Sequence, residues 1–311
     1  MQRKLIISLF LFFTPVVVGC MLVEFLARAV PESYEFNAKQ LEENQHAIEV
    51  LVLGSSQMLN AVNAAWLARP AINMASGDQH HDTDFKIAKA MIERLPKLNT
   101  VVFEVSYSHF EMPFNGPDFW KNNIYLSYYD INNFERPTYF KDRSLFLAQR
   151  RLFSEKIYNH FIENDSQIGF NRYGFDTLHY GGMFQNLAYN TSSIETRAIK
   201  INTKENLSIF SKNTEHFAGM LRYFEANHIQ VIICKAPMYD SFLRKRNANI
   251  LRRRDRVLSQ IMLDFPKVKF LDFEEDTTTF MVDDYINQSH LNPKGAAKFT
   301  KALSNLIEAQ D

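Results

Sequence analysis

The feature that most constrains the fold is a repeated pairing of short apolar runs with helical patterns. Apolar runs of strand length occupy residues 50–53, 71–75, 101–105, 230–234 and 268–273. Helical spacing is found at residues 62–67, 82–95, 205–226, 247–263 and from Pro293 onward. Strands that alternate with helices in this way predict a parallel, doubly wound α/β sheet. A chain of 311 residues, 46% of them hydrophobic, is long enough to bury a sizeable core.

The N-terminus carries a second apolar signal of a different kind. Residues 5–23 contain no charge, Arg3 and Lys4 precede them, and Glu24 is the first acidic residue. About 20 apolar residues span a bilayer as a helix, so we predict a single transmembrane anchor over residues 1–30. Basic residues on the short leading side predict a cytoplasmic N-terminus and an extracytoplasmic remainder, with residues 5–23 in the lipid bilayer. A cleaved signal peptide and a lipid anchor at Cys20 are the alternatives.

The remainder divides into a connector and one large domain. Residues 31–47 are polar and acidic and are interpreted as a juxtamembrane connector, and residues 48–311 as the α/β domain. Within it, residues 110–201 form an aromatic-rich insertion with one strong helical pattern at 144–162. We interpret the aromatic side chains as the insertion's own small core, with a sugar-stacking surface as the alternative.

Charge and cysteine usage exclude several classes of protein. The chain has 35 basic and 35 acidic residues, so no global basic field would gather nucleic acid. The arginine-rich run at 244–256 is interpreted as a solvated helix face or a contact with acidic headgroups. The two cysteines, Cys20 and Cys234, indicate no disulfide framework. His80 and His81 are interpreted as solvated turn residues, so we predict neither a metal site nor a cofactor.

Polar residues of a compatible kind follow the predicted strands. Ser56 follows the first strand, Gly77 the second and Ser108 or His109 the third, while His290 precedes the final helix. Ligand sites of open α/β sheets lie at the carboxyl ends of the strands. A serine on a sharp turn between a strand and a helix exposes its hydroxyl, and a histidine beside it can remove the hydroxyl proton.

These residues resemble the sequence blocks of the SGNH/GDSL hydrolase superfamily. The first block matches Gly54-Ser55-Ser56, the second Ser76-Gly77-Asp78 and the last Asn287-Gln288-Ser289-His290-Leu291. The resemblance implies a flavodoxin-like, three-layer α/β/α fold with a mainly parallel sheet. It also implies Ser56 as the nucleophile, His290 as the base, and the backbone N–H groups of Ser56 and Gly77 as oxyanion donors.

Two positions depart from the family pattern. The third-block asparagine is absent and Ser108 is the nearest substitute, which puts one oxyanion donor in doubt; losing such a donor costs about 10²–10³ in rate. The position of the triad acid, three residues before His290, is occupied by Asn287, which carries no charge. We therefore expect Asn287 to orient the imidazole, with Asp283 or Asp284 as the source of a carboxylate.

With its anchor, the chain resembles the membrane-tethered branch of the superfamily, which works beside membrane-bound O-acyltransferases on envelope polymers. The resemblance implies an esterase or O-acyltransferase acting on an envelope glycan or acylated polymer. A catalytically weak subunit that binds a glycan or docks a membrane-bound O-acyltransferase is the second hypothesis. A structural envelope component is the third.

Overall fold

The computed structural model describes residues 2–163 and 169–309. The chain divides into two compact units. Unit 1 comprises residues 1–32 and 117–168, and unit 2 comprises residues 33–116 and 169–311. Each is described by itself.

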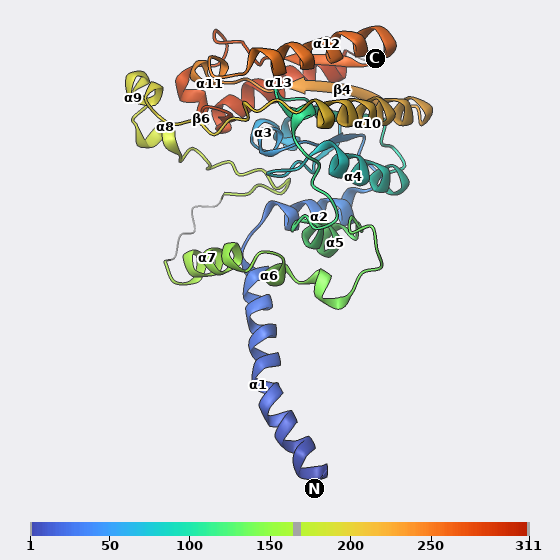
Figure 1. The fold of residues 1–311 in the computed structure, drawn as a ribbon, viewed down its shortest axis with the longest axis vertical. Coiled ribbons are helices and arrows are strands. Elements are labelled where there is room, and N and C mark those ends of the chain that lie inside the picture. The colour runs from blue at the N-terminus through green and yellow to red at the C-terminus, as the bar shows by residue number, and fades with distance from the viewer. Residues whose placement is uncertain (1, 164–168, 310–311) are drawn as a thin grey trace. The chain divides into compact units, whose positions relative to one another are not determined.

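A five-stranded parallel sheet forms the centre of unit 2 (Figure 1). Its strands are β1 (Val50–Val52), β2 (Ala71–Asn73), β3 (Thr100–Glu104), β4 (Gln230–Lys235) and β5 (Lys269–Asp272). Their order is β2-β1-β3-β4-β5, and every neighbouring pair is parallel. This is the flavodoxin-like order, so the predicted fold class is confirmed. A small antiparallel pair, β6 (Tyr285–Asn287) and β7 (His290–Leu291), lies outside the main sheet.

Helices cover both faces of the sheet because strand side chains alternate between the faces. On one face, Val52, Val102 and Ile232 share a core with α3 (Ser56–Ala61) and α13 (Pro293–Glu308). On the other face, Phe103 packs against Phe224 of α10 (Leu207–Ala226), with ring centroids 5.2 Å apart, and α4 (His81–Arg94) adds Phe85 beside Phe224. The remaining helices of unit 2 are α2 (Ser33–Asn44), α8 (Met183–Asn186), α9 (Thr191–Glu195), α11 (Asp240–Leu243) and α12 (Ala248–Asp264). Its short 3-10 turns are η1 (Ala64–Trp66), η2 (His109–Glu111) and η4 (Val282–Asp284).

The helix after β1 begins earlier than its apolar spacing predicts. We expected a helix at 62–67, but α3 starts at Ser56 and only a 3-10 turn follows at Ala64–Trp66. Ser55 explains the start, since its Oγ accepts a hydrogen bond from the Gln57 N–H at 3.2 Å. This is the usual N-cap arrangement, and it places Ser56 in the first turn of α3.

Residues 33–44 of the predicted connector fold as helix α2 of unit 2. Asn37 Nδ2 donates to the Asn73 carbonyl oxygen at 2.7 Å, and Gln40 Nε2 donates to the Arg172 carbonyl at 3.1 Å. Tyr34 and Ser76 share a hydroxyl hydrogen bond of 2.5 Å. Helix α2 is therefore tied to the end of β2.

Unit 1 contains the long apolar helix α1 (Gln2–Ala29), whose 18-residue apolar window has a mean hydropathy of 2.6 and is nowhere buried. By length and composition, α1 could cross a membrane. The other elements of unit 1 are α5 (Asn122–Tyr129), η3 (Phe140–Arg143), α6 (Leu145–Ala148) and α7 (Arg150–Phe161). The helix predicted at 144–162 is interrupted at Gln149, where φ is −152°.

Candidate active site

The candidate site lies where the turns after β1 and β2 meet. Ser56 opens α3 directly after the β1 turn, and Gly54 in that turn has a φ of +129°. That backbone conformation is open to glycine and strained for other residues. The Ser76 N–H donates to the Gly54 carbonyl at 3.0 Å, which holds the turn carrying Gly77 beside the turn carrying Ser56.

The β6–β7 hairpin and the start of α13 position His290. Asn292 caps α13 by accepting hydrogen bonds from Lys294 N at 2.9 Å and Gly295 N at 3.1 Å. Its Nδ2 also donates to the Asp283 carbonyl at 2.8 Å. The asparagine thus caps α13 and fixes both ends of the loop that bears His290.

Three side chains form a hydrogen-bonded chain at this point. Ser56 Oγ lies 2.8 Å from His290 Nε2, and His290 Nδ1 lies 2.9 Å from Asn287 Oδ1. The three residues come from α3, β7 and β6, and all three side chains are partly exposed. The structure therefore brings together the predicted nucleophile, base and orienting amide.

The neighbours of Asn287 determine which nitrogen of His290 carries a proton. Ser289 N–H, which can only donate, points at Asn287 Oδ1 at 2.9 Å, so this atom is the amide oxygen and not the nitrogen. An amide oxygen can only accept, and it therefore favours a proton on His290 Nδ1. Nε2 is left with its lone pair toward Ser56, the tautomer that a general base needs.

Burial, together with a smaller repulsion from the nearby His179, lowers the pKa of His290 to about 4. The imidazole is therefore neutral at pH 7. The causes of the shift include no carboxylate of the described residues that would raise the pKa. The site thus holds a correctly oriented but weak base.

Asp284, which sequence reasoning offered as a source of the triad carboxylate, is directed elsewhere. Its Oδ2 accepts from the Met281 N–H at 2.7 Å and pairs with Lys298 Nζ at 2.6 Å. Asp283 pairs with Lys294 at 2.5 Å. The structure places the Asn287 amide, and not either aspartate, at His290 Nδ1.

Ser108, the substitute for the third-block asparagine, is buried in the 3-10 turn that follows β3. Its Oγ donates to the sulfur of Met112 at 3.5 Å. The hydroxyl hydrogen is therefore engaged within its own turn. Oxyanion binding by the N–H groups of Ser56 and Gly77 stays a prediction.

Two buried carboxylates accept hydrogen bonds from the turn at Gly54 and Ser55, which precedes the predicted nucleophile Ser56. Neither was predicted from the sequence. Glu104, at the end of β3, accepts from the Ser55 N–H at 2.9 Å and from the Ser55 hydroxyl at 2.8 and 3.0 Å. Asp84 Oδ1 accepts from the Gly54 N–H at 3.1 Å and from Gln79 Nε2 at 2.6 Å. Burial raises the pKa of Glu104 to about 7 and that of Asp84 well above its ordinary value. An acidic residue at the end of an otherwise apolar strand was the available signal for Glu104.

The adjacent histidines were expected to be solvated turn residues, and this is wrong. His80 and His81 are buried, with exposed fractions of 3% and 0%. His81 stacks on His109 with ring centroids 4.3 Å apart, and burial lowers the pKa of each of the three imidazoles. Within residues 2–163 and 169–309, no group of three or more His, Cys, Asp or Glu is arranged to hold a metal ion.

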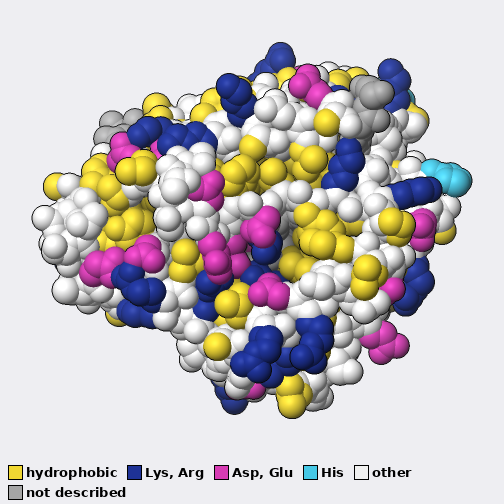
Figure 2. Space-filling model, turned by 90° about the horizontal axis from the view of Figure 1, so that it is seen from above, with side chains coloured by type: hydrophobic (Ala, Val, Ile, Leu, Met, Phe, Trp, Pro, Cys, Tyr) yellow, Lys and Arg dark blue, Asp and Glu magenta, His cyan; other side chains and the backbone are white. Residues whose placement is uncertain are grey.

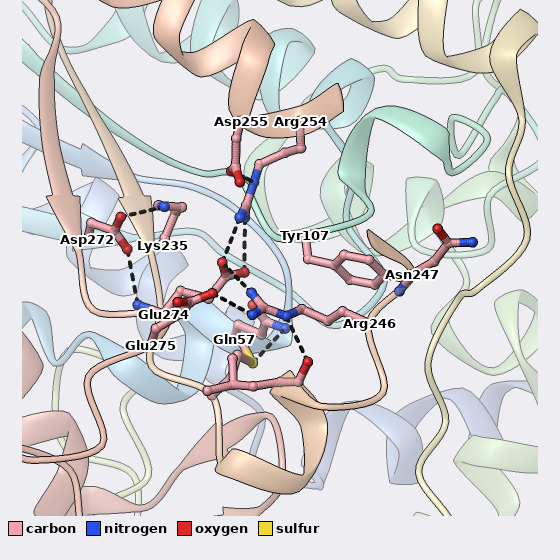
Figure 3. A network of polar contacts seen from close by, with 12 residues as sticks. Gln57, Tyr107, Lys235, Arg246, Asn247, Arg254, Asp255, Asp272, Glu274 and Glu275 are labelled. Carbon is pink, nitrogen blue, oxygen red and sulfur yellow. Dashed lines mark hydrogen bonds and ion pairs between the residues drawn. The ribbon is translucent and has the colours of Figure 1, made fainter. Parts of the chain in front are cut away.

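The arginine-rich run is largely neutralised by acidic partners. Arg254 makes a bidentate pair with Glu274 at 2.9 and 2.6 Å, and both side chains are 2% exposed. Arg246 joins the same carboxylate at 2.9 Å (Figure 3), and Arg253 pairs with Glu111 at 2.6 Å. The expectation of a solvated face is therefore wrong for these arginines. Acidic and basic side chains are interspersed on the face that Figure 2 shows.

The likenesses of this chain to known proteins are weak. No protein-family model matches the chain, and no curated protein matches it. Fourteen chains of solved structures match. One is a Bacteroides fragilis protein provisionally described as an acylhydrolase, with a TM-score of 0.42 and 11% identity over 88% of this chain and 92% of that chain.

Proposed function

We propose that the protein is a serine esterase or O-acyltransferase in which Ser56 is the nucleophile. The observation that supports this most is the chain from Ser56 Oγ through His290 to Asn287, with distances of 2.8 and 2.9 Å. Such distances are within the reach that proton transfer needs. The resemblance of the surrounding sequence blocks to the SGNH superfamily supports the same reaction class.

The proposed reaction proceeds in two steps. In the first, Ser56 Oγ attacks the ester carbonyl as its proton passes to His290 Nε2. The N–H groups of Ser56 and Gly77 hold the oxyanion, and the leaving alcohol takes the proton from Nε2. In the second, Nε2 removes a proton from water or a sugar hydroxyl as its oxygen attacks the carbonyl of the Ser56 ester. Nε2 then gives this proton to Ser56 Oγ as the ester bond breaks and the free acid or the new sugar ester leaves. Water gives hydrolysis and a sugar hydroxyl gives acyl transfer.

The proposed setting is the outer side of the bacterial cytoplasmic membrane, with α1 as a single-pass anchor. An envelope glycan or other acylated polymer is the proposed substrate, and a membrane-bound O-acyltransferase is the proposed partner. The apolar helix α1, the basic residues Arg3 and Lys4 in its first turn and the sequence resemblance support this setting. An alkaline phosphatase fused to the C-terminus reports topology, since it is active only outside the cytoplasm of a bacterial host. An inactive but full-length fusion would contradict export.

The test of the chemistry is hydrolysis of p-nitrophenyl acetate by the full chain and by its S56A variant. We expect S56A to lose the hydrolysis above background. Ser259 provides a matched control, because it is an exposed serine on α12 that takes no part in the chain from Ser56 to Asn287. We expect S259A to retain the activity.

A second candidate function follows from the amide at position 287. An uncharged partner stabilises an imidazolium poorly, which favours a weak or inactive subunit that binds a glycan or docks the acyltransferase. Equal rates for the wild-type protein and S56A, both at background, would support this alternative and rule out Ser56 as a working nucleophile on this ester.

A further inference from the structure

Unit 1 exposes large apolar side chains next to α1, in a segment that is not part of α1 itself. Phe140 in η3 is 96% exposed, and Tyr139 and Leu147 are 61% and 52% exposed. We call residues 139–151 the flanking segment. It contains η3, α6 and the first residues of α7.

Hydrogen bonds from Glu24 fix the flanking segment at one level of α1. Glu24 accepts from Ser144 Oγ at 2.7 Å and from the N–H groups of Leu145 at 3.0 Å and Phe146 at 3.1 Å. Arg28 Nη2 donates to the Arg143 carbonyl at 2.6 Å. Glu24 is the first charged residue after the apolar run, so these bonds hold η3 and α6 where the apolar part of α1 ends (Figure 1).

The exposure of Phe140 belongs to an ordered turn. Asp142 is 4% exposed, accepts from Arg136 at 2.7 and 3.0 Å and accepts from the Tyr139 N–H at 2.7 Å. The buried carboxylate thus fixes the backbone on both sides of Phe140. A single exposed apolar side chain needs no explanation, but Tyr139, Phe140 and Leu147 are all exposed within one short segment next to α1, and grouped apolar exposure marks an interaction surface.

The charges around these apolar side chains fit one kind of surface. Lys141 and Arg150 are exposed on either side of α6, whereas the acidic side chain between them, Asp142, is buried and paired. Aromatic side chains beside Lys and Arg are typical of segments at the boundary between headgroups and acyl chains. Cations at this level attract anionic lipid headgroups.

We propose that the flanking segment lies in the headgroup region of the bilayer that α1 crosses, with Phe140 and Leu147 inserted into its acyl boundary. The inference rests on the proposed anchoring by α1 and is independent of the esterase chemistry. It assigns unit 1 a second membrane contact, parallel to the bilayer plane, which would restrict how unit 1 tilts and rotates on its anchor.

Depth-dependent quenching tests this proposal on the full chain. In a C20S background, cysteine is introduced as F140C, L147C, V16C or K301C, labelled with a fluorophore and reconstituted in phosphatidylethanolamine–phosphatidylglycerol vesicles. The remaining native Cys234 is buried. Val16 lies inside the apolar run, and Lys301 is an exposed position on α13 of unit 2.

We expect the labels at 140 and 147 to be quenched several-fold more by doxyl-labelled lipids than the label at 301, and to be protected from aqueous iodide. If lipid quenches the label at 16 but iodide quenches the labels at 140 and 147 as strongly as the label at 301, the proposed membrane contact of the flanking segment is wrong. The proposed anchoring by α1 would still stand. Iodide quenching at 16 would overturn both.

Discussion

Replacing Asn287 by aspartate should increase the esterase activity, because it adds the charge that the site lacks. Asn287 Oδ1 already accepts from Ser289 N–H and from His290 Nδ1, both at 2.9 Å. A carboxylate oxygen can take over both hydrogen bonds without moving the imidazole. The substitution N287D therefore changes mainly the electrostatics behind the base.

The magnitude follows from the geometry. With the two atoms at 2.9 Å, the centres of charge of a carboxylate and an imidazolium would be about 4 Å apart. Their attraction is about 4 kcal/mol at the effective dielectric of a protein surface. Because both side chains are partly exposed, we halve this value to about 2 kcal/mol at the low end. A range of about 2–4 kcal/mol corresponds to roughly 30- to 1000-fold in kcat.

The comparison with a serine protease supports the upper limit. Changing its triad aspartate to asparagine costs about 10⁴ because the amide also imposes the wrong histidine tautomer. Here the Ser289 N–H turns the amide oxygen toward His290, so that part of the loss is avoided. The gain from N287D should therefore stay below about 10⁴.

The assay is the pH dependence of p-nitrophenyl acetate hydrolysis. The base must be neutral to act, so kcat/KM of the wild-type protein should rise with pH through about 4, the pKa of His290, and then level off. A carboxylate at 287 stabilises the imidazolium and should move this rise toward neutral pH. N287A is the matched loss of the amide oxygen, and the double variant S56A/N287D should be inactive. An N287D protein with an unchanged profile and rate would refute the reasoning.

Three further substitutions test the surroundings of the site by urea unfolding. Glu104 has its pKa raised by burial from 4.5 to about 7, so the native state binds its proton more tightly and loses stability as pH rises between these values. E104Q should remove this pH-dependent loss of unfolding free energy, which is roughly 3 kcal/mol between pH 4.5 and 8. If the stability of wild type and E104Q fell equally with pH, the raised pKa of Glu104 would be contradicted. Among the described residues, R254A leaves the buried Glu274 carboxylate paired with Arg246 alone, and it should lower the free energy of unfolding by about 3 kcal/mol. The double variant R254M/E274Q should recover much of this stability. A double variant as unstable as R254A would argue against the charge effect. N292A removes the α13 cap and should lower the free energy of unfolding by about 1 kcal/mol. If the cap positions His290, the activation free energy calculated from kcat should rise by more than this loss of stability.

The elements that could be predicted from sequence are those with a strong local signal. The strands of the main sheet and helices α4, α10 and α12 follow from apolar periodicity, and the N-cap of α13 follows from Asn292 before Pro293. The start of α3 could not be found in this way, because a single serine side chain, Ser55, decides it. The division that joins residues 117–168 to the N-terminal residues also lacks a periodic signal.

The site was predictable in part for a similar reason. Ser56 and His290 stand in recognisable blocks, although 234 residues separate them in the chain. The burial of Glu104, and the pairing of the arginine run with Glu111 and Glu274, depend on partners that only the tertiary fold supplies. A carboxylate or an arginine is expected at the surface unless such a partner is known.

The distribution of charge in the site bears on whether the protein is a slow enzyme or an inactive subunit. Two buried carboxylates, Glu104 and Asp84, bind the nucleophile turn at Ser55 and Gly54, whereas the partners of His290 Nδ1 among the described residues are the Asn287 amide and the Ser289 hydroxyl. The geometry of the serine is therefore strongly determined, while the imidazolium is weakly stabilised. In a serine protease, positioning and oxyanion binding alone retain roughly 10³–10⁴ over the uncatalysed rate when the triad is lost. A protein that keeps the serine, the histidine and the correct tautomer should have a higher rate enhancement than this residual value. A slow but Ser56-dependent rate is thus the expected state, and a rate that does not depend on Ser56 would favour the docking subunit.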